Sequence, residues 1–193
     1  MSVVHPIVAV TGSSGAGTSS VRLAFERIFQ SEGITPAIIE GDSFHRYDRK
    51  EMEWEVEKAS LQGRTLTHFG PDGNMFDELE NLFAIFAANG TGKQRYYIHS
   101  ENEAELHQGN PGTFTDWQAL SANCDLLFYE GLHGALVTEE VNIAKHVDLL
   151  IGVVPIINLE WMQKIHRDCS VRGYSTDAAT AMILRRMPDY VHY

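Results

Sequence analysis

Residues 7–19 read IVAVTGSSGAGTS, an apolar run followed directly by a glycine-rich segment. The apolar run is typical of a buried strand, and the residues after the glycines are helix-like. Glycines let the backbone turn tightly, so that its N–H groups converge on an anion at the positive end of a helix. The order of strand, glycine-rich turn and helix therefore predicts a phosphate-binding loop.

The spacing of this loop, Gly12-x4-Gly17-x-Ser19, agrees with the pattern G-x4-G-K-[ST] at every place except one. Thr18 stands where the pattern has lysine. We therefore expect the loop to bind a nucleotide phosphate and the missing cation to come from elsewhere in the chain.

A dinucleotide-binding fold is the competing interpretation of the same residues. The turn also resembles that of short-chain dehydrogenases, and Glu40 ends a second apolar run, where a ribose-binding acid would lie. However, the glycines are spaced G-x-x-G-x-G rather than G-x-G-x-x-G, and the chain has no Tyr-x-x-x-Lys pair for proton transfer. These departures favour the phosphate loop.

Composition narrows the class of protein further. A net charge of −11 argues against a nucleic-acid-binding surface and against an anionic membrane as partner. Cys124 and Cys169 form no disulfide framework, which indicates a reducing compartment and predicts a cytoplasmic location. The longest apolar run, residues 149–157, contains a proline and is too short to span a bilayer.

Apolar runs and helix-like stretches alternate along the chain, which predicts an α/β three-layer sandwich with a mostly parallel central sheet. Ligands bind such sheets at the carboxyl ends of the strands. A single domain over residues 1–193 is the simplest division. Strands are expected at 7–11, 37–40, 126–130 and 149–154, helices at 21–30, 76–88, 156–168 and 177–187, and long polar loops or a lid at 62–74 and 90–111.

A dense polar cluster, EGDSFHR at residues 40–46, follows the second strand. In the functional interpretation Asp42 is a general base that deprotonates a substrate hydroxyl, while His45 and Arg49 hold an anionic group on that substrate. In the alternative, Asp42 or Ser43 is simply the N-cap of the next helix. A cap explains one residue and leaves the others without a role, so we favour the site.

A single acid, Glu130, ends the apolar strand at 126–130. In phosphate-loop proteins an acid at this place reaches the Mg²⁺ bound to the nucleotide, and Ser19 would supply a second oxygen. An acid at the end of one strand is a weak signal, but its pairing with the phosphate loop strengthens it. We therefore expect Ser19 and Glu130 at a magnesium site.

The helix expected at 156–168 concentrates charge, because Lys164, Arg167 and Asp168 can share one face. Either they form an ordinary surface ion pair, or Lys164 or Arg167 replaces the cation that is missing at Thr18. Spacing alone leaves both alternatives open. Arg185 and Arg186 are likewise either helix-end cations or contacts for a phosphate-bearing ligand or a neighbouring subunit.

These strings together closely resemble the bacterial phosphoribulokinases of the phosphoribulokinase/uridine kinase family of P-loop kinases. The resemblance is carried, in the family's order, by GSSGAGTS, EGDSFHRY, PGTFTDW, LFYEGLHG, VVPIINLEW and ILRRMPDYV, and reaches the last residue. Bacterial members share the departure at Thr18. The resemblance implies a P-loop kinase fold and an enzyme that uses ATP and Mg²⁺ to phosphorylate D-ribulose 5-phosphate to ribulose 1,5-bisphosphate in the Calvin cycle.

The resemblance also implies roles for individual residues. Asp42 matches the catalytic base, Glu130 the metal-directed acid, Asp168 an acid needed for turnover, and Lys164 and Arg167 the cations of the catalytic helix. His45, Arg49 and Arg172, with His99 a weaker candidate, match contacts to the sugar phosphate. Arg185 and Arg186 match a region tied to activation by NADH and inhibition by AMP in an octameric assembly. The implied ATP-binding residues are Gly12, Ser13, Ser14, Gly15, Ala16, Gly17, Thr18, Ser19 and Ser20.

Family members continue for about a hundred residues beyond the point that corresponds to Tyr193. This difference keeps a second class of function open, a non-catalytic nucleotide-binding relative that acts through a partner. A uridine or pantothenate kinase is the nearest enzymatic alternative. His45, Arg49 and Arg172 discriminate against it, since a phosphorylated sugar requires cations that uridine does not.

Overall fold

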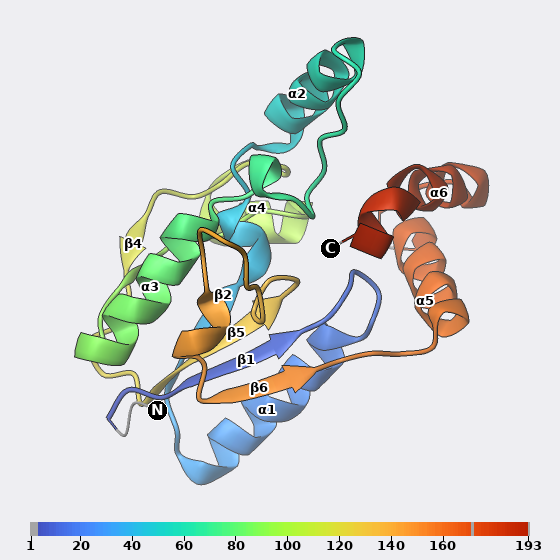
Figure 1. The fold of residues 1–193 in the computed structure, drawn as a ribbon. Coiled ribbons are helices and arrows are strands. Elements are labelled where there is room, and N and C mark those ends of the chain that lie inside the picture. The colour runs from blue at the N-terminus through green and yellow to red at the C-terminus, as the bar shows by residue number, and fades with distance from the viewer. Residues whose placement is uncertain (1–3, 171, 193) are drawn as a thin grey trace.

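The structure is a computed structural model that describes residues 4–170 and 172–192. Its centre is a four-stranded parallel sheet in the order β2-β5-β1-β6 (Figure 1). All three strand pairs are parallel, so the carboxyl ends of all four strands lie at one edge of the sheet. The strands are β1 (Ile7–Thr11), β2 (Pro36–Glu40), β5 (Leu126–Gly131) and β6 (Leu149–Gly152).

The two faces of the sheet are covered by different helices. On one face Ile7 and Ala9 join a core cluster with Phe83 and Phe86 of α3 (Phe76–Asn89). On the other face the intervening residues, such as Val10, pack with the aromatic residues of α1 (Thr18–Glu32). Because successive side chains of a strand point to opposite faces, a continuous apolar run fills both cores. The predicted three-layer α/β sandwich is confirmed.

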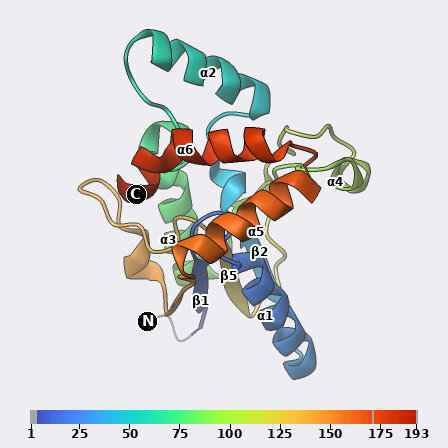
Figure 2. The same ribbon diagram turned by 90° about the vertical axis from the view of Figure 1, so that its right-hand side faces the viewer.

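Two helices lie beyond the carboxyl ends of the strands. The chain leaves β6 into α5 (Ile157–Ser170) and then into α6 (Thr176–His192), which cross above that edge of the sheet (Figure 2). Shorter elements lie in the segments that connect these strands and helices. They are the 3₁₀ turns η1 (Gly41–Phe44), η2 (Pro71–Gly73) and η3 (Ile143–His146), the small strands β3 (Lys93–Gln94) and β4 (Gln118–Ala119), and the helices α2 (Arg49–Leu61) and α4 (Glu101–His107).

The strands and helices expected from the apolar pattern are present, with ends shifted by a few residues. The expectation of loops throughout 90–111 was wrong, because α4 forms there with Ser100 as its N-cap. The pattern also gave no sign of α2. That helix projects from the body of the protein and begins at a capping box between Asp48 and Glu51 (Figure 1). Both helices begin at a side-chain cap and bury few residues, Met52 and Ala59 in α2 and Ala104 in α4.

No helix in the described part of the chain is long and apolar enough to cross a membrane.

Candidate functional site

The phosphate loop connects β1 to α1 at the carboxyl edge of the sheet. Gly15 and Gly17 have φ angles of 103° and 102°, a region that favours glycine. Gly17 is the N-cap of α1 and provides no side-chain cap, so the first N–H groups of the helix face outward toward the loop. A helix terminus of this kind suits an anion such as a nucleotide phosphate.

The loop is held in place by close packing against the segment that follows β6 and against α5. A Cβ atom on Gly12 would lie 2.7 Å from the carbonyl oxygen of Val153. One on Gly15 would lie 3.0 Å from both the carbonyl oxygen of Glu160 and the Cβ of Lys164. The loop is therefore pressed against α5, and glycine is required at both positions.

Replacing Gly15 by alanine is expected to weaken ATP binding by about tenfold or more, because the added Cβ meets α5 and the positive φ angle strains any side chain. Gly63→Ala is the matched control, since Gly63 also has a positive φ angle but has open space around it. Calorimetric titration of ATP into each variant measures the difference. Equal affinities in the two variants would contradict a phosphate-binding role for the packed loop.

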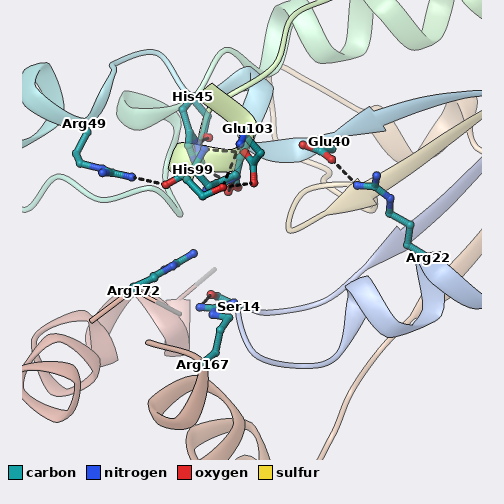
Figure 3. Close-up of polar contacts among 12 residues, drawn as sticks. Ser14, Arg22, Glu40, His45, Arg49, His99, Glu103, Arg167 and Arg172 are labelled. Carbon is teal, nitrogen blue, oxygen red and sulfur yellow. Dashed lines mark hydrogen bonds and ion pairs between the residues drawn. The ribbon is translucent and has the colours of Figure 1, made fainter. Parts of the chain in front are cut away.

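Thr18, the residue at the lysine place of the pattern, hydrogen-bonds to the side chain of Glu130. Burial raises the pKa of the Glu130 carboxyl, the charges of Asp42 and Glu40 raise it further, and Thr18 and Arg22 oppose them. Arg22 pairs with Glu40, the neighbour of Glu130 across the sheet (Figure 3). Carboxylate and hydroxyl oxygens therefore lie close together next to the phosphate loop.

These oxygens fit a magnesium ion chemically, since Mg²⁺ prefers hard oxygen ligands and usually takes only one or two carboxylates from the protein. Within the described residues no three histidine, cysteine or acidic side chains are arranged to hold a metal by themselves. Ser19 is exposed at the start of α1, next to Thr18. The donor set therefore suits a metal shared with a nucleotide and does not form a closed metal centre.

Asp42 lies in η1, directly after β2, with its carboxylate half-exposed between two histidines. Its Oδ1 is 3.3 Å from Nε2 of His45, and its Oδ2 is 3.5 Å from Nε2 of His99. Burial would raise the pKa of Asp42, but the charge and hydrogen bond of His45, with a smaller contribution from His99, hold that pKa below its usual range. Asp42 is thus ionised and remains accessible from solvent.

Arg49 and His99 come to this cluster from different segments. Arg49 is the first residue of α2, and one of its Nη atoms donates to the carbonyl oxygen of His99 over 3.4 Å (Figure 3). Arg49 also hydrogen-bonds to Tyr97, although burial is the larger influence and raises the pKa of the tyrosine. The structure thereby brings His45, Arg49 and His99 together around Asp42.

A second charged cluster lies on α5. Asp168 is fully buried and pairs with three cations, Lys164 at 3.2 Å, Arg167 at 3.1 Å and Arg172 at 3.2 Å. Lys164 is itself only 2% exposed, and burial lowers the pKa of its ammonium group against the attraction of Asp168. The interpretation of these residues as an exposed surface ion pair was therefore wrong. Lys164 and Asp168 form a buried pair, and the partly exposed Arg167 and Arg172 complete the network around Asp168.

This network adjoins the phosphate loop. Arg167 donates to the hydroxyl oxygen of Ser14 over 3.1 Å, and Lys164 packs on Gly15. Figure 3 shows Arg167, Arg172 and Ser14 facing the cluster of His45, His99 and Arg49 across the site. The loop has no lysine at position 18, but two cations of α5, Lys164 and Arg167, lie beside it. Either of them could take the place of the missing lysine.

Arg185 and Arg186 differ in their surroundings. Arg185 is exposed on α6, whereas Arg186 is partly buried. The positive charge of Arg186 lowers the pKa of His45, His68 and Lys164, which places it near both charged clusters. The sequence left this arginine open as a helix-end cation, a contact for a phosphate-bearing ligand or subunit, or part of a regulatory region, and the structure adds its proximity to the site.

Arg95 is a site residue that sequence reasoning missed. It donates to the carbonyl oxygens of Ser43 and His45 over 2.8 and 2.7 Å, and its guanidinium group stacks on Phe114 at 3.6 Å. Arg95 therefore fixes the backbone of η1, which carries Asp42. No motif marks it, because its partners are backbone atoms 50 residues away. The aromatic residues Phe114 and Trp117 both pack against this arginine, and Trp117 also packs against Phe44.

A phosphate loop at the carboxyl edge of a parallel sheet, faced by a carboxylate and a ring of cations, defines an α/β protein of the P-loop kinase type. The sequence profile described as the Phosphoribulokinase / Uridine kinase family matches residues 7–193. The chain belongs to this family.

Two bacterial relatives show the extent of the similarity. The chain is 58% identical to the phosphoribulokinase of Nitrobacter vulgaris over 98% of its own length, and 52% identical to the probable phosphoribulokinase of Escherichia coli K12 over its whole length. It spans 66% of the length of the first and 67% of the second.

Solved structures agree with this assignment. Phosphoribulokinase from Rhodobacter spheroides superimposes with a TM-score of 0.82 at 49% identity, over 97% of this chain and 64% of that one. D-glycerate 3-kinase from Cryptococcus neoformans matches with a TM-score of 0.63 at 14% identity, which shows the shared fold alone.

Proposed function

We propose that this chain carries the catalytic site of an ATP-dependent kinase that phosphorylates D-ribulose 5-phosphate to ribulose 1,5-bisphosphate, the reaction that supplies the carboxylase of the Calvin cycle. The observation that carries the proposal is the ionised Asp42 between His45 and His99, opposite the phosphate loop and its cations. A hydroxyl acceptor needs the base, and its phosphate group needs the cations. Relatives named phosphoribulokinase across the whole chain support the choice of acceptor.

In this mechanism the chain positions both substrates and stabilises charge. The loop from Gly12 to Ser20, including Ser13, Ser14, Ala16 and Thr18, would hold the phosphates of ATP, and Ser19 and Glu130 would hold Mg²⁺, which neutralises phosphate charge. Asp42 would accept the proton of the C1 hydroxyl group as its oxygen bonds to the γ-phosphorus and the bond to the β-phosphate oxygen breaks. Lys164 or Arg167 would stabilise the charge that develops on the transferred group.

The acceptor's own phosphate group would lie among His45, Arg49, His99 and Arg172. In the structure Asp42 holds two of these groups and Asp168 holds a third. The phosphate group of an anionic acceptor could take over these cationic side chains from Asp42 and Asp168. An uncharged acceptor such as uridine would gain little from the same side chains. This reasoning favours a sugar phosphate over a nucleoside.

The proposal extends to regulation and location. Arg185 and Arg186 are proposed to take part in a response to NADH and AMP, in a homo-oligomer that in bacterial relatives is an octamer. Residues 1–193 are proposed to form one domain with no nucleic-acid or membrane partner. A cytoplasmic location is proposed from Cys124 and Cys169, both free in the structure.

Turnover of Mg-ATP by this chain tests the proposal, with ribulose 5-phosphate, unphosphorylated ribulose and uridine as parallel acceptors. ADP release that depends on ribulose 5-phosphate, with kcat/KM at least about a hundredfold above the other two, is the expected result. Preference for uridine would replace the proposal with a nucleoside kinase. ATP binding without turnover of any acceptor would favour a non-catalytic relative.

A further inference from the structure

The side chain of Asn74 is held in one orientation by backbone atoms. Asn74 is 1% exposed, and its Nδ2 donates to the carbonyl oxygens of His68 and Gly70 over 2.9 and 2.8 Å. A reversed amide would set its oxygen against these two carbonyl oxygens, which is unfavourable. The Oδ1 atom of Asn74 must therefore point the other way, toward His45.

The Nδ1 atom of His45 forms a hydrogen bond of 2.9 Å with Oδ1 of Asn74. Because Oδ1 can only accept, the hydrogen of this bond must belong to Nδ1 of the histidine. The opposite ring nitrogen, Nε2, faces the carboxylate of Asp42 at 3.3 Å, which also can only accept. A ring with an acceptor at each nitrogen is fully satisfied only as the doubly protonated imidazolium.

The turn that carries Asn74 is built to keep it there. A Cβ atom on Gly73 would lie 2.3 Å from the carbonyl oxygen of Thr67, so the turn closes tightly. Its backbone also pairs with the segment of His45, since Arg46 N donates to the carbonyl oxygen of Gly73 and Met75 N to that of Phe44, each over 2.9 Å. The contact between Asn74 and His45 therefore joins two firmly connected segments.

Other groups around His45 raise or lower the pKa of its ring. Burial and the charge of Arg186 on α6 lower the pKa of His45, but Asp42 and Asn74 outweigh them and the pKa is raised. The ring of His68 lies against it in a tilted arrangement, with centroids 4.4 Å apart, and burial lowers the pKa of His68 to about 3, so this neighbour is neutral. His99 shares Asp42, and the ring of Tyr97 contacts His45 edge-on.

We propose that Asn74 is a positioning residue that holds His45 as a cation at neutral pH, with its Nε2–H directed at the carboxylate of Asp42, beside which an anionic acceptor binds. The nature of that acceptor rests on the proposed function, whereas the charge state of His45 does not. An amide that can turn freely would stabilise the neutral ring as well. The two backbone acceptors that fix Asn74 therefore determine the charge of a histidine that neither of them contacts.

The direct test is a pH titration of the histidine ring nitrogens by ¹⁵N NMR on the full chain. His45 is expected to carry hydrogens on both nitrogens at pH 7. In Asn74→Ala its pKa is expected to fall by about one unit or more, because the charged ring loses an acceptor. Arg46→Met is the matched control. It removes a bond from Arg46 to the backbone carbonyl of Asn74 and leaves the ring contact intact, so the pKa should not change.

Two results would overturn the proposal without any assay of turnover: an unprotonated Nδ1 on His45 at pH 7 in the unaltered chain, or an unchanged pKa in folded Asn74→Ala. The first remains decisive if the variant fails to fold. A pKa shift of the same size in Arg46→Met would indicate that loosening of the turn causes the effect. That result would also contradict the proposed role of the Asn74 side chain.

Kinetics then separate a positioning role from a structural one. If the acceptor is a sugar phosphate, its KM should rise as pH passes upward through the pKa of His45, and in Asn74→Ala this rise should move to lower pH. Comparing variants at each pH cancels the ionisation of the acceptor itself. In a His45→Gln background, Asn74→Ala should leave KM unchanged, and a further rise there would contradict action through His45. Absence of turnover in the unaltered chain would refute the proposed function and leave the NMR result standing.

Discussion

Asp42→Asn is expected to lower kcat by about 10³-fold while ATP affinity stays within about twofold, since a positioned general base contributes roughly 10²–10⁴-fold. Asparagine preserves the shape of the side chain between His45 and His99 but cannot accept the proton of an acceptor hydroxyl group. The phosphate loop lies apart from this contact, so nucleotide binding should be retained. Steady-state kinetics with ribulose 5-phosphate and calorimetric titration with ATP measure the two quantities.

Asp48→Asn provides the matched control for that experiment. Asp48 caps α2 six residues farther along the chain, and asparagine caps helices about as well as aspartate. Its kcat should stay close to that of the unaltered chain. Near-normal turnover in Asp42→Asn would remove Asp42 from the role of base, and an equal loss in both variants would point to a disturbed loop.

Asp168→Asn is expected to lower the free energy of unfolding by about 3 kcal/mol, because it leaves the buried ammonium group of Lys164 without its carboxylate. Lys164 and the two arginines lower the pKa of Asp168 against the effect of burial. The stabilisation is therefore present above the unfolded-state pKa, about 3.9, and is lost as pH falls through the lower folded-state value. Urea unfolding at pH 7 and at pH 3.5 should show the difference between variant and parent shrinking at the lower pH.

Lys164→Met is the informative comparison for this network. It removes the buried cation but leaves Asp168 with Arg167 and Arg172, so its effect on stability should be smaller than that of Asp168→Asn. Both variants should lose turnover if the network supplies the cation that the loop lacks. A stable Asp168→Asn, within about 1 kcal/mol of the parent at pH 7, would contradict a network organised by the buried carboxylate.

The local pattern of residues predicted the sheet and its covering helices well. Strands buried on both faces read as continuous apolar runs, and α3 repeats its apolar residues at helical spacing. The helices α2 and α4 escaped prediction because they are short or exposed. Their ends are set by Asp48, Glu51 and Ser100, which also occur in loops. Capping alone is too common a signal to predict a helix.

The candidate site divides in the same way. Asp42, His45 and Arg49 lie within eight residues, and Lys164, Arg167 and Asp168 within five, so spacing alone suggested each cluster. The contributions of Asn74 and Arg95 could not be predicted. They act through backbone carbonyl oxygens and a ring nitrogen that only the folded chain brings within hydrogen-bonding distance.

The sequence by itself determined the fold class, the place of the phosphate loop and the residue types around it, because these depend on periodicity and short-range spacing. Only the tertiary structure decided which groups share a proton or a charge. It buried Asp168 among three cations, set His99 against Asp42, and turned the amide of Asn74 toward His45. The physical reason is that burial and hydrogen-bond direction are set by contacts between distant segments, and these two quantities control the charge of a side chain.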